Sequence, residues 1–121
     1  MSHKNLDLWN DSIKLAGAVY RFTRALPAEY RYSLSDQMQR AVVSISSNVA
    51  EGAARGSYRE FIRYLNIAAG SASELDTHLA ILREVEPSSP EKLDHIQLSF
   101  NDISRMIQGL IKSIRRKIDE N

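Results

Sequence analysis

Arginines recur at every fourth position in one segment near the middle of the chain: Arg55, Arg59 and Arg63. Residues four apart lie on one face of an α-helix, so Arg59 and Arg63 are expected to project together. Cationic side chains gathered on one surface can contact phosphates, and such binding is salt-sensitive and largely independent of base sequence. The spacing therefore indicates a candidate contact surface for RNA or DNA. The alternative is a solvated face without a partner.

Two further clusters of cations extend this candidate surface. They are Arg21 and Arg24, near the end of the first helical pattern, and Lys112, Arg115, Arg116 and Lys117, near the end of the last. We place the end of the fourth helix at the opposite pole from the end of the second, so that the cations form at least two patches. Because the helix dipole by itself favours cations at a helix C-terminus, a solvated face is again the alternative. Four aromatic residues lie near the cations in sequence and offer rings for base stacking: Tyr58, Tyr64, Tyr30 and Tyr32.

The residue types give little support to catalytic chemistry. The chain has no cysteine, which excludes thiolate nucleophiles and cysteine metal sites. Glu74 with His78 and Glu91 with His95 are spaced by four, unlike the Glu-x-x-His pairs of carboxylate-bridged metal bundles. We expect surface ion pairs or hydrogen bonds at these positions. Glycine-rich phosphate loops and nucleophile elbows are also missing, so we expect no catalytic residues, metal or cofactor, and no enzyme.

Four helices must position these side chains. With 121 residues, 43% of them hydrophobic and 26% charged, the chain has the composition of a single helical domain, 1–121. Apolar residues recur in alternating steps of three and four, and stop signals divide this pattern at about 6–26, 33–55, 57–85 and 90–118. Short connections make neighbouring helices antiparallel. The predicted fold class is all-α, an antiparallel up-down-up-down four-helix bundle.

Capping residues mark the predicted helix starts. Ser57 and Glu60 form a capping box, in which each side chain satisfies a backbone donor of the other residue. Gly56, just before it, is suited to end the preceding helix. The other helix starts are assigned to Asn5, Ser33 and Ser89, the last followed by Pro90.

The first two helices carry wider apolar faces than one bundle seam requires. The additional stripes are Trp9, Ile13, Ala16 and Tyr20 in the first helix, and Val43, Ser46, Ala50 and Ala53 in the second. A compact bundle could bury both stripes, or they could form a subunit interface. Gly52 and Gly70 would each weaken an exposed helix, so both suggest close backbone approach between the second and third helices.

Three motifs link the chain to a known family: "SNVAEG" at 47–52, "R-x-S-x-x-E-F" at 55–61 and "A-x-G-S-x-x-E-L" at 68–75. Through them, residues 6–85 resemble the bacterial 23S rRNA intervening-sequence proteins, whereas the last helix matches only as an apolar helix. The family usually has proline where this chain has Ser46, so a bend in the second helix is expected to be weaker. The motif positions assigned to packing or an interface are Ser44, Ser47, Asn48, Glu51, Gly52, Ser57, Glu60, Gly70, Ser71 and Glu74.

The resemblance also carries expectations about assembly and partners. It implies a bundle that associates as a homopentamer and has a suspected RNA partner. It further implies a relation to the accessory variability protein of diversity-generating retroelements, which binds nucleic acid and a reverse transcriptase. We therefore expect a non-catalytic homo-oligomeric scaffold that binds RNA or DNA; the alternative is a protein-interaction adaptor, for example for a reverse transcriptase. No apolar run approaches the ~18 residues that span a membrane, and the N-terminus lacks the apolar core of a signal peptide, so the expected location is the cytoplasm.

Overall fold

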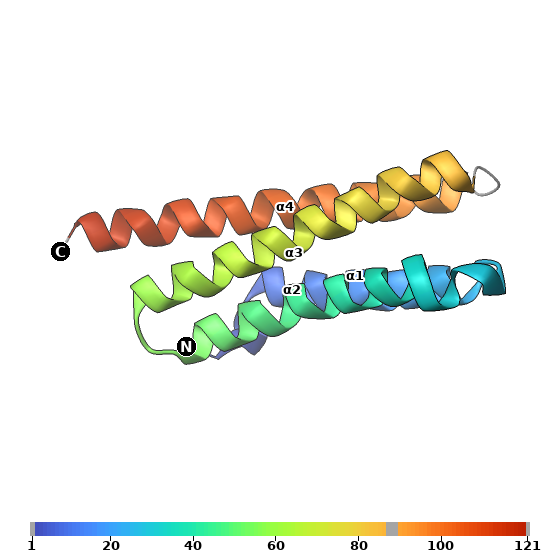
Figure 1. Ribbon diagram of the computed structural model, residues 1–121. Coiled ribbons are helices and arrows are strands. Elements are labelled where there is room, and N and C mark those ends of the chain that lie inside the picture. The colour runs from blue at the N-terminus through green and yellow to red at the C-terminus, as the bar shows by residue number, and fades with distance from the viewer. Residues whose placement is uncertain (1, 87–89, 121) are drawn as a thin grey trace.

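Four antiparallel helices form the molecule, as the sequence pattern predicts. In the computed structural model, which describes residues 2–86 and 90–120, they are α1 (Asp7–Arg24), α2 (Asp36–Ala54), α3 (Tyr58–Val85) and α4 (Pro90–Asp119). Figure 1 shows α1 beside α2 and α3 beside α4, with each helix reversing the direction of the one before. Each helix contacts its two neighbours around the bundle, including α1 with α4. The all-α, up-down-up-down four-helix bundle is confirmed.

The core consists of the main apolar seams of the four helices. Val19, Val42, Ile45, Leu65 and Leu79 are among the side chains that are fully enclosed. Burying such a side chain stabilises a fold by roughly 1.5–3 kcal/mol, so these seams account for the association of helices that would be marginal alone. None of the helices in the described ranges is long and apolar enough to cross a membrane.

The turn between α2 and α3 follows the predicted capping pattern in its main features. Gly56 has φ +80°, in the left-handed region that favours glycine. The Ser57 Oγ accepts a hydrogen bond from the Glu60 backbone N–H at 3.2 Å, which caps α3. The Glu60 carboxylate makes an ion pair with Arg63 at 3.5 Å. At the other predicted start, α4 does begin at Pro90, whereas Ser89 lies outside the described residues.

Two predicted caps are wrong, because short helical turns precede both helices. A 3-10 turn at His3–Asn5 comes before α1, so the N-cap position falls on Leu6 rather than Asn5. A π-helical turn at Arg31–Ser35 continues directly into α2. Ser33 therefore lies inside helical backbone, and its Oγ donates to the Tyr30 carbonyl at 3.4 Å.

The additional apolar stripes of α1 and α2 are covered only in part. Trp9, Ala16 and Tyr20 pack against the edge of the core, and Ala53 is buried. In contrast, Ile13 is 44% exposed and Val43 is 42% exposed. A bundle of one chain thus leaves apolar surface on the outer side of these two helices.

Close helix approach occurs at Gly52 but not at Gly70. A Cβ placed at Gly52 would lie 2.9 Å from the Tyr64 Cβ and 3.3 Å from the Phe61 carbonyl oxygen. Gly70 is exposed, and apart from its chain neighbours and the backbone of its own helix, no described atom lies within 4 Å of an added Cβ. The prediction for Gly70 is therefore wrong, because it is the neighbouring Ser71, not Gly70, that α3 turns toward α2.

Candidate nucleic-acid interface

The tight α2–α3 connection determines where Arg55 projects. Gly52 lets α3 approach the last turn of α2, and Gly56 then reverses the chain within two residues. Arg55, at the end of α2, is consequently placed beside the first two turns of α3. Arg55, which precedes α3 in sequence, thus shares a surface with Arg59 and Arg63 of α3.

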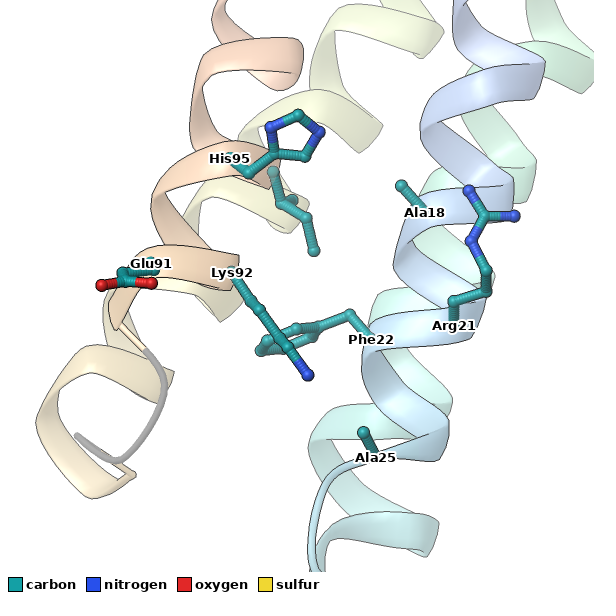
Figure 2. Close-up of a pocket in the computed structure, with 8 residues that line it drawn as sticks. Ala18, Arg21, Phe22, Ala25, Glu91, Lys92 and His95 are labelled. Carbon is teal, nitrogen blue, oxygen red and sulfur yellow. The ribbon is translucent and has the colours of Figure 1, made fainter.

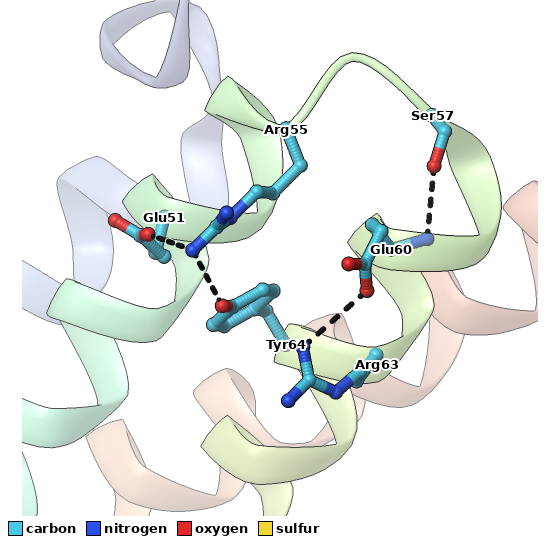
Figure 3. Close-up of polar contacts among 6 residues, drawn as sticks. All are labelled: Glu51, Arg55, Ser57, Glu60, Arg63 and Tyr64. Carbon is cyan, nitrogen blue, oxygen red and sulfur yellow. Dashed lines mark hydrogen bonds and ion pairs between the residues drawn. The ribbon is translucent and has the colours of Figure 1, made fainter.

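Tyr64 lies between two arginines at this surface (Figure 3). The Arg55 Nη2 donates to the Tyr64 hydroxyl at 2.7 Å and to the Glu51 Oε1 at 2.5 Å. The guanidinium carbons of Arg55 and Arg63 lie 5.0 Å and 5.2 Å from the centroid of the tyrosine ring. The electrostatic interaction with Tyr64 and, second in size, that with Glu51 raise the pKa of Arg55. The guanidinium group of Arg55 therefore retains its charge. The cluster orients two cations around one aromatic ring.

The end of α4 lies beside the start of α3, contrary to the prediction. Figure 1 shows the C-terminal end of the chain at the same end of the molecule as the α2–α3 turn. Two reversals separate α2 from α4, so the two helices run parallel and must end at the same pole. The Lys117 Nζ accordingly lies 5.7 Å from the ring centroid of Tyr58, the first residue of α3. The expected separation into opposite poles is wrong for this cluster.

One end of the bundle therefore carries cations from three helices. Arg59 and Arg115 line a shared groove of about 360 Å³ together with Ile62, Ile118 and Asp119. We call the following set of exposed side chains the basic end: Arg55, Arg59, Arg63, Lys112, Arg115, Arg116 and Lys117. Arg55 and Arg63 make ion pairs with glutamates. Within the described residues, no ion pair involves Arg59, Lys112, Arg115 or Arg116.

Arg21 and Arg24 lie in the last turn of α1, at the opposite end of the bundle. Arg21 lines a groove of about 460 Å³ between α1 and α4, into which Phe22 and Lys92 project from the two sides (Figure 2). Glu91 and His95 line the same groove, so its charge is mixed. The candidate cations thus form two groups. The cations at the end of α4 share one group with the arginines at the α2–α3 turn, contrary to expectation, and Arg21 and Arg24 form the other group.

Some polar motif residues of α2 contact α3, whereas others are exposed to solvent. The Ser44 and Ser71 hydroxyls lie 2.7 Å apart, and the Asn48 Nδ2 donates to the Ser44 carbonyl and hydroxyl at 2.8 Å and 3.0 Å. Ser47 of α2 is exposed, as is Glu74 of α3. Ser44, Asn48 and Ser71 therefore form a partly buried network that joins the two helices.

Among the described residues, the histidines are not grouped with acidic side chains as a metal site would require. His78 is 7% exposed, and no hydrogen bond from the part of the chain that the structure describes reaches its Nδ1. The expectation of a surface ion pair or hydrogen bond between His78 and Glu74 is therefore wrong, because α3 turns His78 into the bundle. Burial lowers its pKa, an effect that Glu74 opposes. His95 is exposed at the α1–α4 groove, and no three of the described His, Asp and Glu side chains are placed to hold a metal ion.

Some contacts at the basic end have no local signal in the sequence. Arg55 and Tyr64 are nine residues apart across a turn, and Tyr58 and Lys117 belong to different helices. Counting helix reversals would have placed the end of α4 beside the start of α3. The hydrogen bond from Arg55 to the tyrosine hydroxyl depends on how closely α2 and α3 approach.

Both the sequence and the fold of this chain are similar to those of known proteins. Residues 4–109 match the model of a family described as 23S rRNA-intervening sequence protein. A crystal structure of a protein of unknown function from the S23 ribosomal protein family of Bacteroides thetaiotaomicron is similar, with a TM-score of 0.80 and 26% sequence identity. The match covers 87% of this chain and 98% of that one. No curated protein matches.

Proposed function

The chain belongs to the 23S rRNA-intervening sequence protein family, and from this membership and the geometry of the basic end we propose that it binds RNA. In this proposal it is a binding protein rather than an enzyme. The observation that carries the proposal is the convergence of cations from α2, α3 and α4 at one end of the bundle. Residues more than fifty positions apart in sequence thereby form one surface.

The charges of the basic end support contacts with phosphates. Arg59, Lys112, Arg115 and Arg116 are exposed, and each lacks an ion-pair partner among the described acids. Exposed ion pairs such as Arg55–Glu51 contribute only about 0–1 kcal/mol, so phosphates can replace the glutamates at small cost. The contacts involve backbone phosphates rather than base edges, so the proposed binding is largely independent of sequence.

Titration of structured RNA against salt tests the proposal. If the four cations without ion pairs each neutralise one phosphate, the logarithm of the association constant falls with the logarithm of salt concentration with a slope of about −3. Fluorescence anisotropy of an end-labelled hairpin, at several salt concentrations, measures this slope. Absence of binding at low salt, or affinity that is unaffected by salt, would contradict RNA binding through this end.

We also propose that the protein acts as a homo-oligomer, a pentamer by its resemblance to the family. The supporting observation is the exposed apolar surface on the outer side of α1 and α2, where Ile13 and Val43 are each more than 40% exposed. Tyr20, from the same α1 stripe as Ile13, lies in a groove with Val43. In a ring of protomers, each basic end is repeated, and weak phosphate contacts add up.

Light scattering on a sizing column tests oligomer formation. We expect the wild type to elute as a multimer and the I13E/V43E double variant to elute at a lower mass, since two carboxylates would have to be buried in the interface. The exposed apolar surface is equally the observation that favours a protein-interaction adaptor, for example for a reverse transcriptase. A monomeric wild type that captures a partner protein would support the adaptor and exclude the oligomer.

A further inference from the structure

A pocket opens at the basic end where all four helices meet. It has a volume of about 430 Å³, within the range of roughly 300–1,000 Å³ typical of small-molecule sites. Its walls come from Leu6 before α1, the α2–α3 turn, the first turn of α3 and the last turns of α4. The lining includes apolar side chains from the end of the core, such as Phe61, Leu110 and Ile114.

The rim of this pocket has a different chemistry from its walls. Tyr58 is 42% exposed, and the Lys117 Nζ lies 5.7 Å from the centroid of its ring. Ser113 lines the pocket from α4 and is half-buried. An aromatic ring and an ammonium group therefore stand next to an apolar hollow.

We propose that this pocket holds one unpaired nucleobase of a bound RNA strand, with Lys117 contacting an adjacent phosphate. The proposal rests on the RNA binding proposed above and assigns it a preference. A planar base needs an apolar or aromatic surface on which to stack, and its phosphate needs a nearby cation. Both are present here within one pocket. A paired base stays in its helix and cannot enter, so unpaired RNA is preferred over a duplex.

The surrounding charge favours this occupant over a neutral ligand. Among the described residues that line this pocket, Lys117 is the one charged side chain, and no acid lines it. The neighbouring groove adds Arg59 and Arg115 against a single acid, Asp119, so an occupant at this end meets a net positive charge. The α1–α4 groove is of similar size, about 460 Å³, but Glu91 lies beside Arg21 and Lys92 there. Charge complementarity therefore selects the pocket at the basic end for an anionic strand and gives no such preference to the other groove.

The test compares two RNAs that carry the same number of phosphates. One is a hairpin with 2-aminopurine in its loop, and the other is a blunt duplex with 2-aminopurine in a base pair. We expect wild-type protein to bind the hairpin about tenfold more tightly and to change the fluorescence of the loop base only. Equal affinity for the two RNAs, with no fluorescence change, would overturn the pocket while leaving RNA binding intact. Failure to bind either RNA would overturn both proposals.

Variants of the pocket keep the net charge constant. S113W places an indole in the hollow and is expected to abolish the preference for the hairpin. Q108W puts the same side chain at an exposed position of α4 that does not line the pocket, and it is expected to retain the preference. If S113W does not fold, as judged by circular dichroism, Y58L removes the aromatic rim at a partly exposed position and should reduce the preference. Retention of the tenfold preference in the folded pocket variant would overturn the proposal.

Discussion

The ammonium group of Lys117 lies 5.7 Å from the centre of the Tyr58 ring, which joins the last turn of α4 to the first residue of α3. The two residues are almost sixty positions apart in sequence, yet both lie at the basic end of the bundle. The contact connects the C-terminal cations with the arginines of α3.

Neutralising the groove between α3 and α4 should weaken RNA binding. We expect R59Q/R115Q to lower affinity at low salt and to reduce the magnitude of the salt slope by about 1.5, since each lost phosphate contact removes roughly 0.7–0.9 of a unit. R21Q/R24Q removes the same charge at the opposite end of the bundle and should have a smaller effect. Anisotropy titrations of one RNA with both variants make the comparison. Equal losses would mean that net charge, rather than the basic end, determines binding.

Adding a methyl group at Gly52 should destabilise the bundle. In G52A, the new Cβ would lie 2.9 Å from the Tyr64 Cβ and 3.3 Å from a backbone oxygen, so α2 and α3 would have to separate. We expect a loss of about 1–3 kcal/mol in the free energy of unfolding, measured by urea denaturation. G70A places the same methyl group in open space and should stabilise α3 by up to about 1 kcal/mol. A G52A variant as stable as G70A would contradict the close helix approach.

Removing the hydroxyl of Ser57 should destabilise the start of α3. This hydroxyl accepts the Glu60 N–H, and loss of such an N-cap costs about 0.5–2 kcal/mol. S33A is the matched control, because Ser33 lies within a helical turn and does not cap α2. Urea denaturation should separate the two variants. If S33A loses as much stability as S57A, the assignment of the α2 start is wrong.

Protonation of His78 should weaken the fold at acidic pH. Burial lowers its pKa in the folded state, so the unfolded chain binds the proton more tightly. The free energy of unfolding is therefore unaffected above the unfolded pKa of about 6.5 and falls as pH decreases from there toward the folded pKa. H78L should flatten this dependence, whereas H95Q, at an exposed histidine, should retain it. NMR titration of the imidazole tests the direction independently; a folded-state pKa above 6.5 would contradict it.

The sequence determined the features of this protein that depend on neighbouring residues. Apolar spacing in steps of three and four identified the four helices, and Gly56 with Ser57 marked the start of α3 to the residue. Such signals are visible because helix periodicity and capping operate over a few residues. The caps assigned to Asn5 and Ser33 failed because neighbouring backbone turns, which polar residue types do not reveal, extend the helical path.

The tertiary structure decided which of these residues meet. Gly52 and Gly70 look alike in sequence, but only Gly52 faces the adjoining helix. His78 has the same spacing to a glutamate as His95, and only packing makes it a buried residue. The basic end exists because α2 and α4 finish at the same pole, and the contacts Arg55–Tyr64 and Lys117–Tyr58 follow from the approach of separate helices. Local sequence specifies each helix, whereas the rotation and proximity of packed helices specify the surface that they share.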